Sequence, residues 1–423
     1  MGFSMRIAIL AILIILTGCG GGSGSNPVVR QNNPVPFYTP VKVGNITPLY
    51  NTVSTDTSPV VADLSTAPLS GVGENLIVTG FKSQPTDANH WNNFAISIFG
   101  WQNSKLVDQT SLWFAPGDNI ISGTNSVKFA DLDGRGKLDM VVAPYSDGAL
   151  TSLRPAYVYF NNPYNVFLRS TINININPTE LARPDSRNYI DAHDFAIADL
   201  NHDGHKDIVI GDYGWNTVLA FNNGNRTFTT YTQQNRSLPG SSSLTVADFL
   251  NNGTTTILAV DIGGANNRPG LYSWNIDNTN NLNFTQISLG PLGRFDLPKW
   301  SSYNFGGGAS SNHAIRVVAY DWDDSGVMDA IVLSRPARTN GAWPNYSEIQ
   351  FLKNDGHGNF TDATDSVVVG YNTKSTVSYN PKFVDINGDG LIDILLPTAG
   401  DFSGNNNSSQ ILLKTSDGKY VAA

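Results

Sequence analysis

Short apolar segments alternate with polar turns along most of this chain. The clearest example is an apolar run at 195–199, followed by an acidic turn and a second apolar run at 208–212. Two more short runs, 217–221 and 228–231, meet through a tight turn that contains Asn and Gly. Runs of this length that are rich in β-branched residues and bounded by Gly and Asn are typical of strands and hairpins. This segment therefore predicts four consecutive antiparallel strands.

The same order of strands and turns recurs along the chain. Its acidic turn begins at six positions, which are Asp63, Asp131, Asp199, Asp248, Asp321 and Asp385. The intervals between them are 68, 68, 49, 73 and 64 residues, so six units account for residues 37–423. Four strands per unit, repeated radially, are typical of a β-propeller. We predict an all-β fold of six four-stranded blades, with seven blades as the alternative.

The two ends of the repeat region suggest how the ring closes. Residues 410–414 and 419–421 are expected to form the third and fourth strands of the last unit. Phe37, Tyr38 and the residues that follow are candidates for an extra outer strand.

The acidic turns resemble the FG-GAP and VCBS repeats of integrin-type propellers. The segment DINGDGLID at 385–393 and the hairpin at 347–360 are both close to the family pattern. The resemblance extends over about 385 residues and implies a calcium-bearing propeller. The family usually has seven blades, so a count of six departs from it, although other FG-GAP-related proteins form six-bladed rings.

Each complete acidic turn carries oxygen side chains at its first, third, fifth and ninth positions, and Gly at its sixth. Calcium prefers about six to eight oxygen ligands and accepts carboxylates, amides and carbonyls together. Three turns are complete, and their candidate ligands are Asp199, Asn201, Asp203 and Asp207; Asp321, Asp323, Ser325 and Asp329; and Asp385, Asn387, Asp389 and Asp393. The sequence predicts structural calcium in these three turns. The alternative is that Asp and Asn serve only as turn-forming residues.

The other three turns are less complete. The turn with Asp131, Asp133 and Asp139 has Arg135 at its fifth position, where a cation opposes a metal ion, so its occupancy is left open. The turns at Asp248 and Asp63 lack several oxygen ligands and are expected to bind nothing. An EF-hand is excluded, because no Glu stands at the twelfth position of these loops.

Composition narrows the possible partners. The chain has 423 residues, a formal charge of −9 and one Cys, and 14% of its residues are charged. Because it has no basic run, nucleic-acid binding is excluded. A single Cys excludes a disulfide framework and a Cys-based zinc site.

The N-terminus has the pattern of an export signal. Arg6 precedes ten apolar residues at 7–16, which are too few to span a bilayer. The following Leu-Thr-Gly-Cys resembles the lipobox of bacterial lipoproteins, which implies cleavage before Cys19 and lipidation of that residue. We therefore expect a signal peptide at 1–18, a lipidated Cys19 with a flexible linker to residue 36, and a propeller at 37–423. The alternative is an ordinary secretory signal that contains Cys by chance.

This interpretation places the protein in the bacterial cell envelope. Gly20 follows Cys19, a pattern that in Gram-negative lipoproteins favours the outer membrane. No later segment is long and apolar enough to cross a bilayer, so the membrane contact is expected through the lipid anchor alone.

The long connections of a propeller lie on the face opposite the acidic turns, and long loops on a rigid scaffold commonly carry binding sites. Here they are expected at 81–93, 171–193, 290–313 and 335–346. Seven aromatic residues in the connections on this face are candidates for stacking on sugars: Trp91, Tyr145, Tyr213, Trp215, Trp300, Tyr303 and Trp343. The alternative is that they pack between blades.

Three functions remain open at this stage. The first is a calcium-stabilised surface propeller that binds an extracellular glycan or protein for adhesion or capture. The second is a polysaccharide lyase or hydrolase on the same scaffold, and the third is a structural subunit of an envelope assembly. No catalytic residue is assigned, and an enzyme is the less favoured choice, because the common hydrolase, metalloprotease and phosphate-binding motifs are missing.

Overall fold

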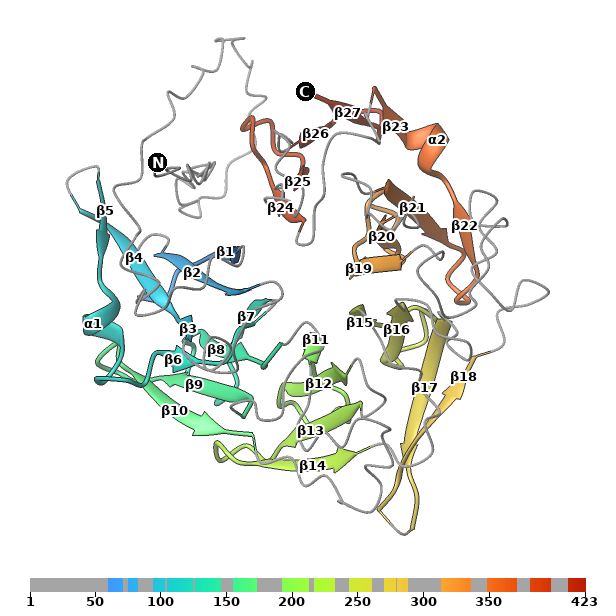
Figure 1. The fold of residues 1–423 in the computed structure, drawn as a ribbon. Coiled ribbons are helices and arrows are strands. Elements are labelled where there is room, and N and C mark those ends of the chain that lie inside the picture. Colours follow the sequence, from blue (N-terminus) through green and yellow to red (C-terminus); the bar gives the residue numbers. More distant parts are fainter. Residues whose placement is uncertain are drawn as a thin grey trace, which may run out of the picture.

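The computed structural model describes residues 60–70, 75–82, 94–102, 105–124, 126–145, 155–172, 192–212, 217–232, 243–260, 270–278, 280–287, 313–335, 348–370, 381–396 and 410–423. These residues form six antiparallel sheets arranged in a ring (Figure 1). The fold is thus an all-β propeller with six blades, as the repeat predicted.

The first three blades each have four strands in chain order from the centre of the ring outward. Blade one consists of β1 (Val60–Ala67), β2 (Asn75–Lys82), β4 (Ser97–Gln102) and β5 (Lys105–Asp108). Blade two consists of β7 (Val127–Ala130), β8 (Asp139–Val142), β9 (Tyr157–Asn161) and β10 (Phe167–Thr171). Blade three consists of β11 (Ala192–Ala198), β12 (Asp207–Asp212), β13 (Val218–Asn222) and β14 (Phe228–Thr232).

The last three blades follow the same order. Blade four consists of β15 (Ser243–Ala247), β16 (Thr256–Val260), β17 (Gly270–Ile276) and β18 (Leu282–Gln286). Blade five consists of β19 (His313–Ala319), β20 (Ala330–Arg335), β21 (Glu348–Asn354) and β22 (Phe360–Asp362). Blade six consists of β24 (Lys382–Val384), β25 (Asp393–Leu396), β26 (Gln410–Lys414) and β27 (Tyr420–Ala422).

Five small elements lie beside or between the blades. The strands β3 (Phe94–Ala95) and β6 (Ile120–Ile121) pair with each other, and the short helix α1 (Thr110–Trp113) follows β5. The short helix α2 (Thr364–Val367) leads into β23 (Val368–Val369). This strand pairs in parallel with β27 and forms the outermost strand of blade six. The outer strand expected from Phe37 and Tyr38 lies outside the described residues.

The structure corrects one predicted turn. Asp63 lies inside β1, where it pairs with Thr79 of β2, so no acidic turn begins there. The strand continues to Ala67 and stops before Pro68, which has no backbone N–H to extend the ladder. The connection of blade one therefore begins after Ala67.

The hydrophobic core lies between neighbouring blades. Val141 and Val158 of blade two, for example, pack with Phe195 and Ile210 of blade three. Similar buried clusters join each of the five successive pairs of blades within the described residues. Between the last and first blades, Lys382 Nζ donates a hydrogen bond of 3.4 Å to Ser65 Oγ. The blades are thus stabilised mainly by their neighbours.

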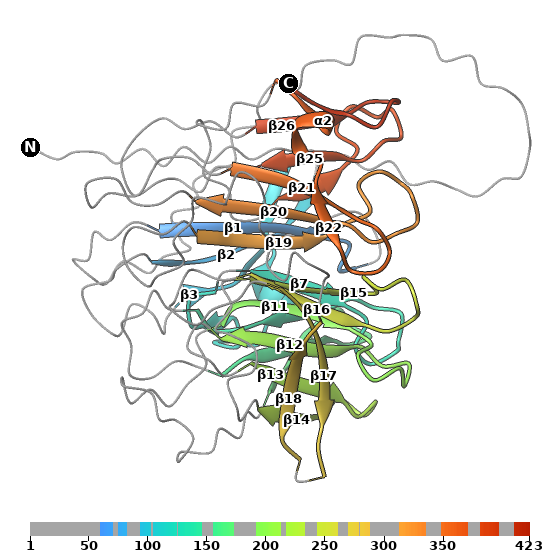
Figure 2. The same ribbon diagram turned by 90° about the vertical axis from the view of Figure 1, so that its right-hand side faces the viewer.

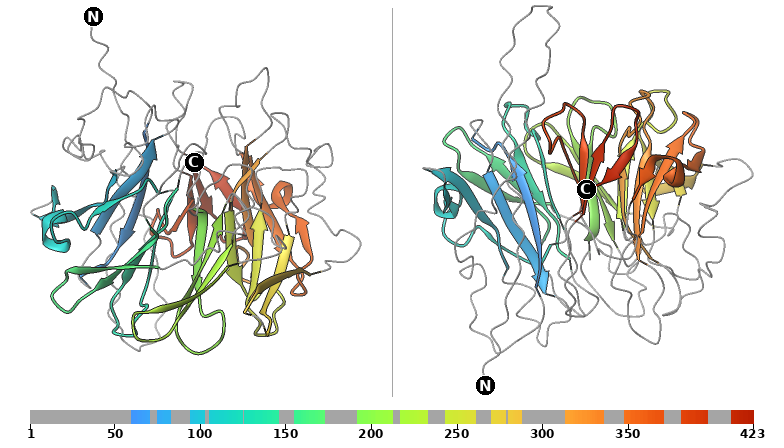
Figure 3. Two further views of the ribbon diagram at one scale, coloured as in Figure 1. Left: turned by 60° about the horizontal axis from the view of Figure 1, so that its bottom comes forward. Right: turned by 90° about the horizontal axis from the view of Figure 1, so that it is seen from above.

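The ring has two distinct faces. In an up-and-down blade, the first-to-second and third-to-fourth turns lie on one face. Seen edge-on, the short hairpins project to one side of the ring (Figure 2). Two further views show how the strands of each blade twist from the centre outward (Figure 3). The acidic turns therefore share a face, and the beginnings of the innermost strands lie at the other.

A buried carboxylate and a buried amide connect each regular blade to its own turn and to the preceding blade. In blade three, Asp207 accepts hydrogen bonds from the backbone N–H groups of Leu200 and Asn222, both at 2.8 Å. The Asn222 side chain donates to the carbonyl oxygen of Leu132, in the acidic turn of blade two, at 2.6 Å. We call this arrangement the Asp–Asn tie.

The tie recurs in blades two and five. There the pairs are Asp139 with Asn161 and Asp329 with Asn354, and the two Asn side chains reach the carbonyls of Leu69 and Phe249 in the preceding blades. In blade six Lys414 replaces the Asn, and its ammonium group forms an ion pair of 2.6 Å with Asp324 of blade five. Blade four has Thr256 in place of the Asp.

We expect Asn222→Ala to lower the free energy of unfolding by about 1–3 kcal/mol, because it leaves the buried carbonyl of Leu132 without this donor. Chemical denaturation of the variant and the parent protein measures the difference. Asn225→Ala, in the exposed part of the same hairpin, is the matched control. Equal losses for the two variants would contradict a special role for the tie.

Candidate functional site

The acidic turns share one backbone conformation. In the Asp199 turn, His202 at the fourth position and Gly204 at the sixth have φ angles of 61° and 89°. The fourth and sixth residues have positive φ in four other turns as well: Gly134 and Gly136, Asn251 and Gly253, Asp324 and Gly326, and Gly388 and Gly390. The sixth-position Gly supplies a conformation that other residues adopt at a cost.

The first Asp of each turn stabilises this conformation. Asp199 accepts backbone hydrogen bonds from Asp203 at 3.2 Å and from Gly204 at 3.0 Å. The same pair of bonds occurs in the turns at Asp131, Asp248, Asp321 and Asp385. Because the Asp248 turn has this geometry despite its incomplete set of oxygens, the turn conformation and the complete oxygen set are separable features.

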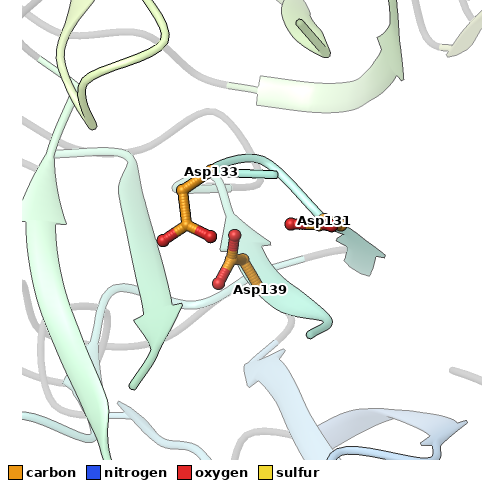
Figure 4. A group of neighbouring side chains, drawn as sticks. All are labelled: Asp131, Asp133 and Asp139. Atoms are coloured by element: carbon orange, nitrogen blue, oxygen red, sulfur yellow. The ribbon is translucent and has the colours of Figure 1, made fainter. Parts of the chain in front are cut away.

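Two turns bring three carboxylates together. Oxygens of Asp131, Asp133 and Asp139 lie within 4.8 Å of one another, and their side chains point toward a common centre (Figure 4). Oxygens of Asp321, Asp323 and Asp329 meet the same limit. The turns at Asp199 and Asp385 also contain three carboxylates each, but their third position is an amide, from Asn201 or Asn387, and a carboxylate stands at the fifth position instead.

The Asp321 turn fits a calcium ion well. Asp329 is fully buried, and its Oδ2 accepts no hydrogen bond. Burial and the nearby negative charge of Asp321 raise the pKa of Asp329 to about 6, although a hydrogen bond from Asn354 lowers it. Carboxylates and the hydroxyl of Ser325 are the oxygen ligands that calcium accepts. A bound cation would neutralise this buried carboxylate.

In the Asp199 turn, Asn201 and Asp203 are exposed, whereas Asp207 is buried. Asp203 accepts hydrogen bonds from the backbone N–H of His205 at 2.8 Å and from the Asn201 side chain at 3.0 Å. The bond from His205 holds the pKa of Asp203 below its usual value. In the Asp385 turn, Asn387 donates to Asp389 at 3.1 Å in the same way. In both turns the structure therefore brings the third-position amide into contact with the fifth-position carboxylate.

The structure also shows a second role for the ninth-position Asp residues, which the sequence analysis took only as metal ligands. Asp139, Asp207 and Asp393 each accept backbone hydrogen bonds with both carboxylate oxygens, as part of the Asp–Asn tie or its Lys414 variant. The sequence signal for this role is an Asp directly before an apolar strand, paired with an Asn at the end of the following strand.

Of the seven aromatic candidates for ligand binding, the structure describes Tyr145. Its side chain is 8% exposed and packs edge-on against His193, with ring centroids 4.8 Å apart. This arrangement fits the alternative of packing between blades. Trp91, Tyr213, Trp215, Trp300, Tyr303 and Trp343 lie outside the described residues, as does Cys19.

A polar cluster that the sequence analysis missed lies beside Tyr145. Asp194 on β11 forms an ion pair of 2.6 Å with Arg316 on β19, and both side chains are buried. Asp194 also accepts a hydrogen bond of 2.5 Å from Ser243 Oγ on β15 and forms an ion pair of 3.0 Å with Lys128 on β7. We call these four residues, which come from four successive blades, the central polar cluster.

Two strand irregularities help to form this cluster. The register of β11 shifts between Ala192 and Asp194, and that of β19 shifts between Ala314 and Arg316. β-Bulges re-aim side chains and occur often near functional sites. Sequence periodicity does not show such shifts, because they depend on how two strands pair. All four residues lie on the innermost strands of their blades, with Ser243 at the beginning of β15 and Arg316 in the middle of β19.

Comparison with known protein families supports the repeat. A family model described as an FG-GAP-like repeat matches residues 199–259, from the acidic turn of blade three into β16. The chain therefore contains an FG-GAP-like repeat within a six-bladed propeller. No curated protein sequence matches the chain significantly. No helix among the described residues has the length and apolar character needed to cross a bilayer.

Several solved structures match the chain at low sequence identity and low TM-score. BBS1N, in complex with ARL6DN, is 10% identical over 81% of this chain and 90% of its own, with a TM-score of 0.39. The GH43 β-1,3-galactosidase BT3683 is 9% identical over 68% and 90%, with a TM-score of 0.34. The V. cholerae biofilm matrix protein Bap1 is 16% identical over 73% and 40%, with a TM-score of 0.33.

We expect His193 to make the protein less stable in acid. Burial and the neighbouring charge of Arg316 lower its pKa from 6.5 to about 3, so the native form stays neutral while the unfolded chain takes up a proton. Stability should therefore fall as pH drops from about 6.5 toward 3, by roughly 2 kcal/mol at pH 5 relative to pH 7.5.

Denaturation curves of His193→Phe at these two pH values test this effect, because Phe keeps an aromatic ring against Tyr145 but does not titrate. We expect the variant to lose less stability than the parent protein on acidification. His357→Gln, at an exposed position, is the control and should behave like the parent protein. An unchanged pH dependence in His193→Phe would contradict the assignment.

Proposed function

We propose that this six-bladed propeller is a lipid-anchored, calcium-stabilised protein of the bacterial cell surface that binds an extracellular glycan or protein. The observation that carries this proposal is the separation of two faces on one rigid ring. The acidic turns and their ties occupy one face, and the other face is left for connections that can vary without disturbing the blades.

Calcium has a structural role in this proposal. Each of the complete turns lies next to a buried tie that joins two strands of its blade, so an ion there would strengthen contacts that already hold the ring. A site with a dissociation constant of about 0.1 mM would add roughly 1.4 kcal/mol at about 1 mM calcium. Three independent sites would add about 4 kcal/mol, a large part of a typical folding free energy.

Ligand binding is proposed on the face opposite the acidic turns. The central polar cluster lies on the innermost strands, which begin on this face, and bulges in β11 and β19 direct its charged side chains toward each other. The connections between second and third strands also belong to this face and carry most of the aromatic candidates. Aromatic rings among polar residues suit both sugar stacking and protein contacts.

One observation favours a second candidate function, a polysaccharide lyase or hydrolase. Tyr145, His193, Asp194 and Arg316 lie close together, and they include an acid, a base and a cation. Such groups can transfer protons and stabilise negative charge when a substrate reaches them. All four are largely buried, so adhesion or capture remains the first proposal.

A glycan array tests the binding function most broadly. We expect residues 26–423, assayed with calcium, to bind one class of sugar and to bind it less when a chelator is added. A polymer that is bound should then be incubated with the protein. Cleavage that Tyr145→Phe abolishes would establish the enzyme instead, and a blank array with folded protein would contradict glycan binding and favour a protein partner or an assembly role.

Anchoring through Cys19 has its own test. If Cys19 carries the lipid, Cys19→Ser should move the protein from the membrane fraction to the soluble fraction of cells that express the full chain. Fractionation followed by immunoblotting measures the distribution, with Ser23→Ala in the linker as the control. A Cys19→Ser variant that stays in the membrane fraction would refute the lipid anchor.

A further inference from the structure

The Asp131 turn differs from the three complete turns at its fifth position. The complete turns have an oxygen side chain there, from Asp203, Ser325 or Asp389, whereas this turn has Arg135. The rest of the turn is regular, because Asp131 accepts backbone hydrogen bonds from Arg135 at 3.0 Å and from Gly136 at 2.7 Å. The substitution thus changes the charge of the turn and keeps its backbone conformation.

Arg135 folds back across its own turn. Its Nε donates a hydrogen bond of 2.6 Å to Asp133 Oδ2, and a terminal guanidinium nitrogen donates to the carbonyl oxygen of Asn161 at 2.8 Å. The guanidinium group is therefore fixed at two points, one on the turn and one at the end of β9. It lies beside a carboxylate that a metal ion would otherwise use.

A second arginine reaches the same carboxylate from the next blade. Arg226, in the turn between β13 and β14, forms an ion pair of 3.0 Å with Asp133 Oδ2. Its guanidinium also lies over the ring of Phe160 in blade two, 5.5 Å from the ring centroid. Arg226 has a φ of 66°, in the left-handed region that residues other than Gly adopt at a cost.

The two arginines carry the same total charge as a calcium ion. Together they carry two positive charges, the same as Ca²⁺, and both lie at one oxygen of Asp133, whose side chain is 4% exposed. Further along the turn, Lys137 donates to Asn165 at 2.7 Å and adds another cation near the turn. A calcium ion entering here would meet repulsion and would lose one of its carboxylate oxygens to the guanidinium groups.

The Asp199 and Asp321 turns differ from this arrangement. Within the described part of the chain, Asp199 and Asp203 form no ion pair with Lys or Arg. In the Asp321 turn, Lys353 contacts Asp323 from a side chain that is 45% exposed, and the buried Lys414 pairs with Asp324, which is not one of the candidate ligands. The position equivalent to Arg135 is Ser325, an oxygen ligand, so the turn remains suited to calcium.

We propose that Arg135 and Arg226 take the place of a calcium ion in the Asp131 turn and make the junction of blades two and three independent of calcium. The proposal rests on the calcium sites proposed for the other turns. The Asp131 turn then binds no metal, and Arg226 links blades two and three electrostatically.

The carboxylates of this turn remain arranged for a metal once the arginine is removed. Oxygens of Asp131, Asp133 and Asp139 lie within 4.8 Å of one another, and Asp133 Oδ1 is buried without a hydrogen-bond partner. Arg135→Asp would remove the guanidinium and restore an oxygen at the fifth position. The substitution should therefore create a calcium site instead of abolishing one.

Calcium stoichiometry, measured by equilibrium dialysis on folded residues 26–423, tests the proposal. We expect three ions per chain in the parent protein and four in Arg135→Asp. Arg135→Asn supplies an oxygen without new negative charge and should also gain one ion. It replaces Arg135→Asp in the test if that variant folds poorly. Lys419→Asp makes the same change of charge at an exposed hairpin and should stay at three.

The measured stoichiometries distinguish a failure of the arginine replacement from a failure of the proposed calcium sites. Four ions in the parent protein, or no gain in either Arg135 variant, would overturn the replacement of calcium by arginine. No ion in the parent protein would refute the structural calcium sites of the proposed function. In that case one ion in Arg135→Asp would still support the role of Arg135, and none would overturn it.

Discussion

The ring depends on a buried carboxylate at the ninth position of its acidic turns. Asp207 shows the principle: its two oxygens accept backbone hydrogen bonds from its own turn and from the third strand of its blade, and Asn222 then reaches the preceding blade. A buried carboxylate is costly unless its oxygens are satisfied, so the turn and the strand end must be in place together. The ties thereby couple the short acidic turns to the packing of whole blades.

The turn conformation and the complete set of oxygen side chains are distinct properties in this protein. The Asp248 turn has the same backbone hydrogen bonds as the complete turns, although Leu250 replaces an oxygen side chain and Thr256 replaces the ninth-position carboxylate. The Asp131 turn keeps the conformation and fills its centre with the charge of arginine. A calcium motif in such a repeat therefore predicts the turn conformation by itself. It predicts a bound ion only when the neighbouring side chains permit one.

The sequence predicted the structural features that depend on short, repeated segments. The spacing of the turns gave six blades, and the sixth-position Gly residues identified the bends, because both depend on short segments. The sequence misplaced the first turn, since Asp63 lies within β1, where strand pairing decides the outcome. It also missed the central polar cluster, because Asp194 and Arg316 meet only through two bulges and the packing of separate blades.

Calcium is predicted in the three complete turns, and arginine is predicted to take its place in the Asp131 turn. Anomalous diffraction from crystals grown with a calcium substitute such as Tb³⁺ locates bound ions directly, without reference to stability or activity. The predicted result is a peak in each of the turns at Asp199, Asp321 and Asp385, with none at Asp131. A strong peak within the Asp131 turn, or no peak in the three complete turns, would contradict it.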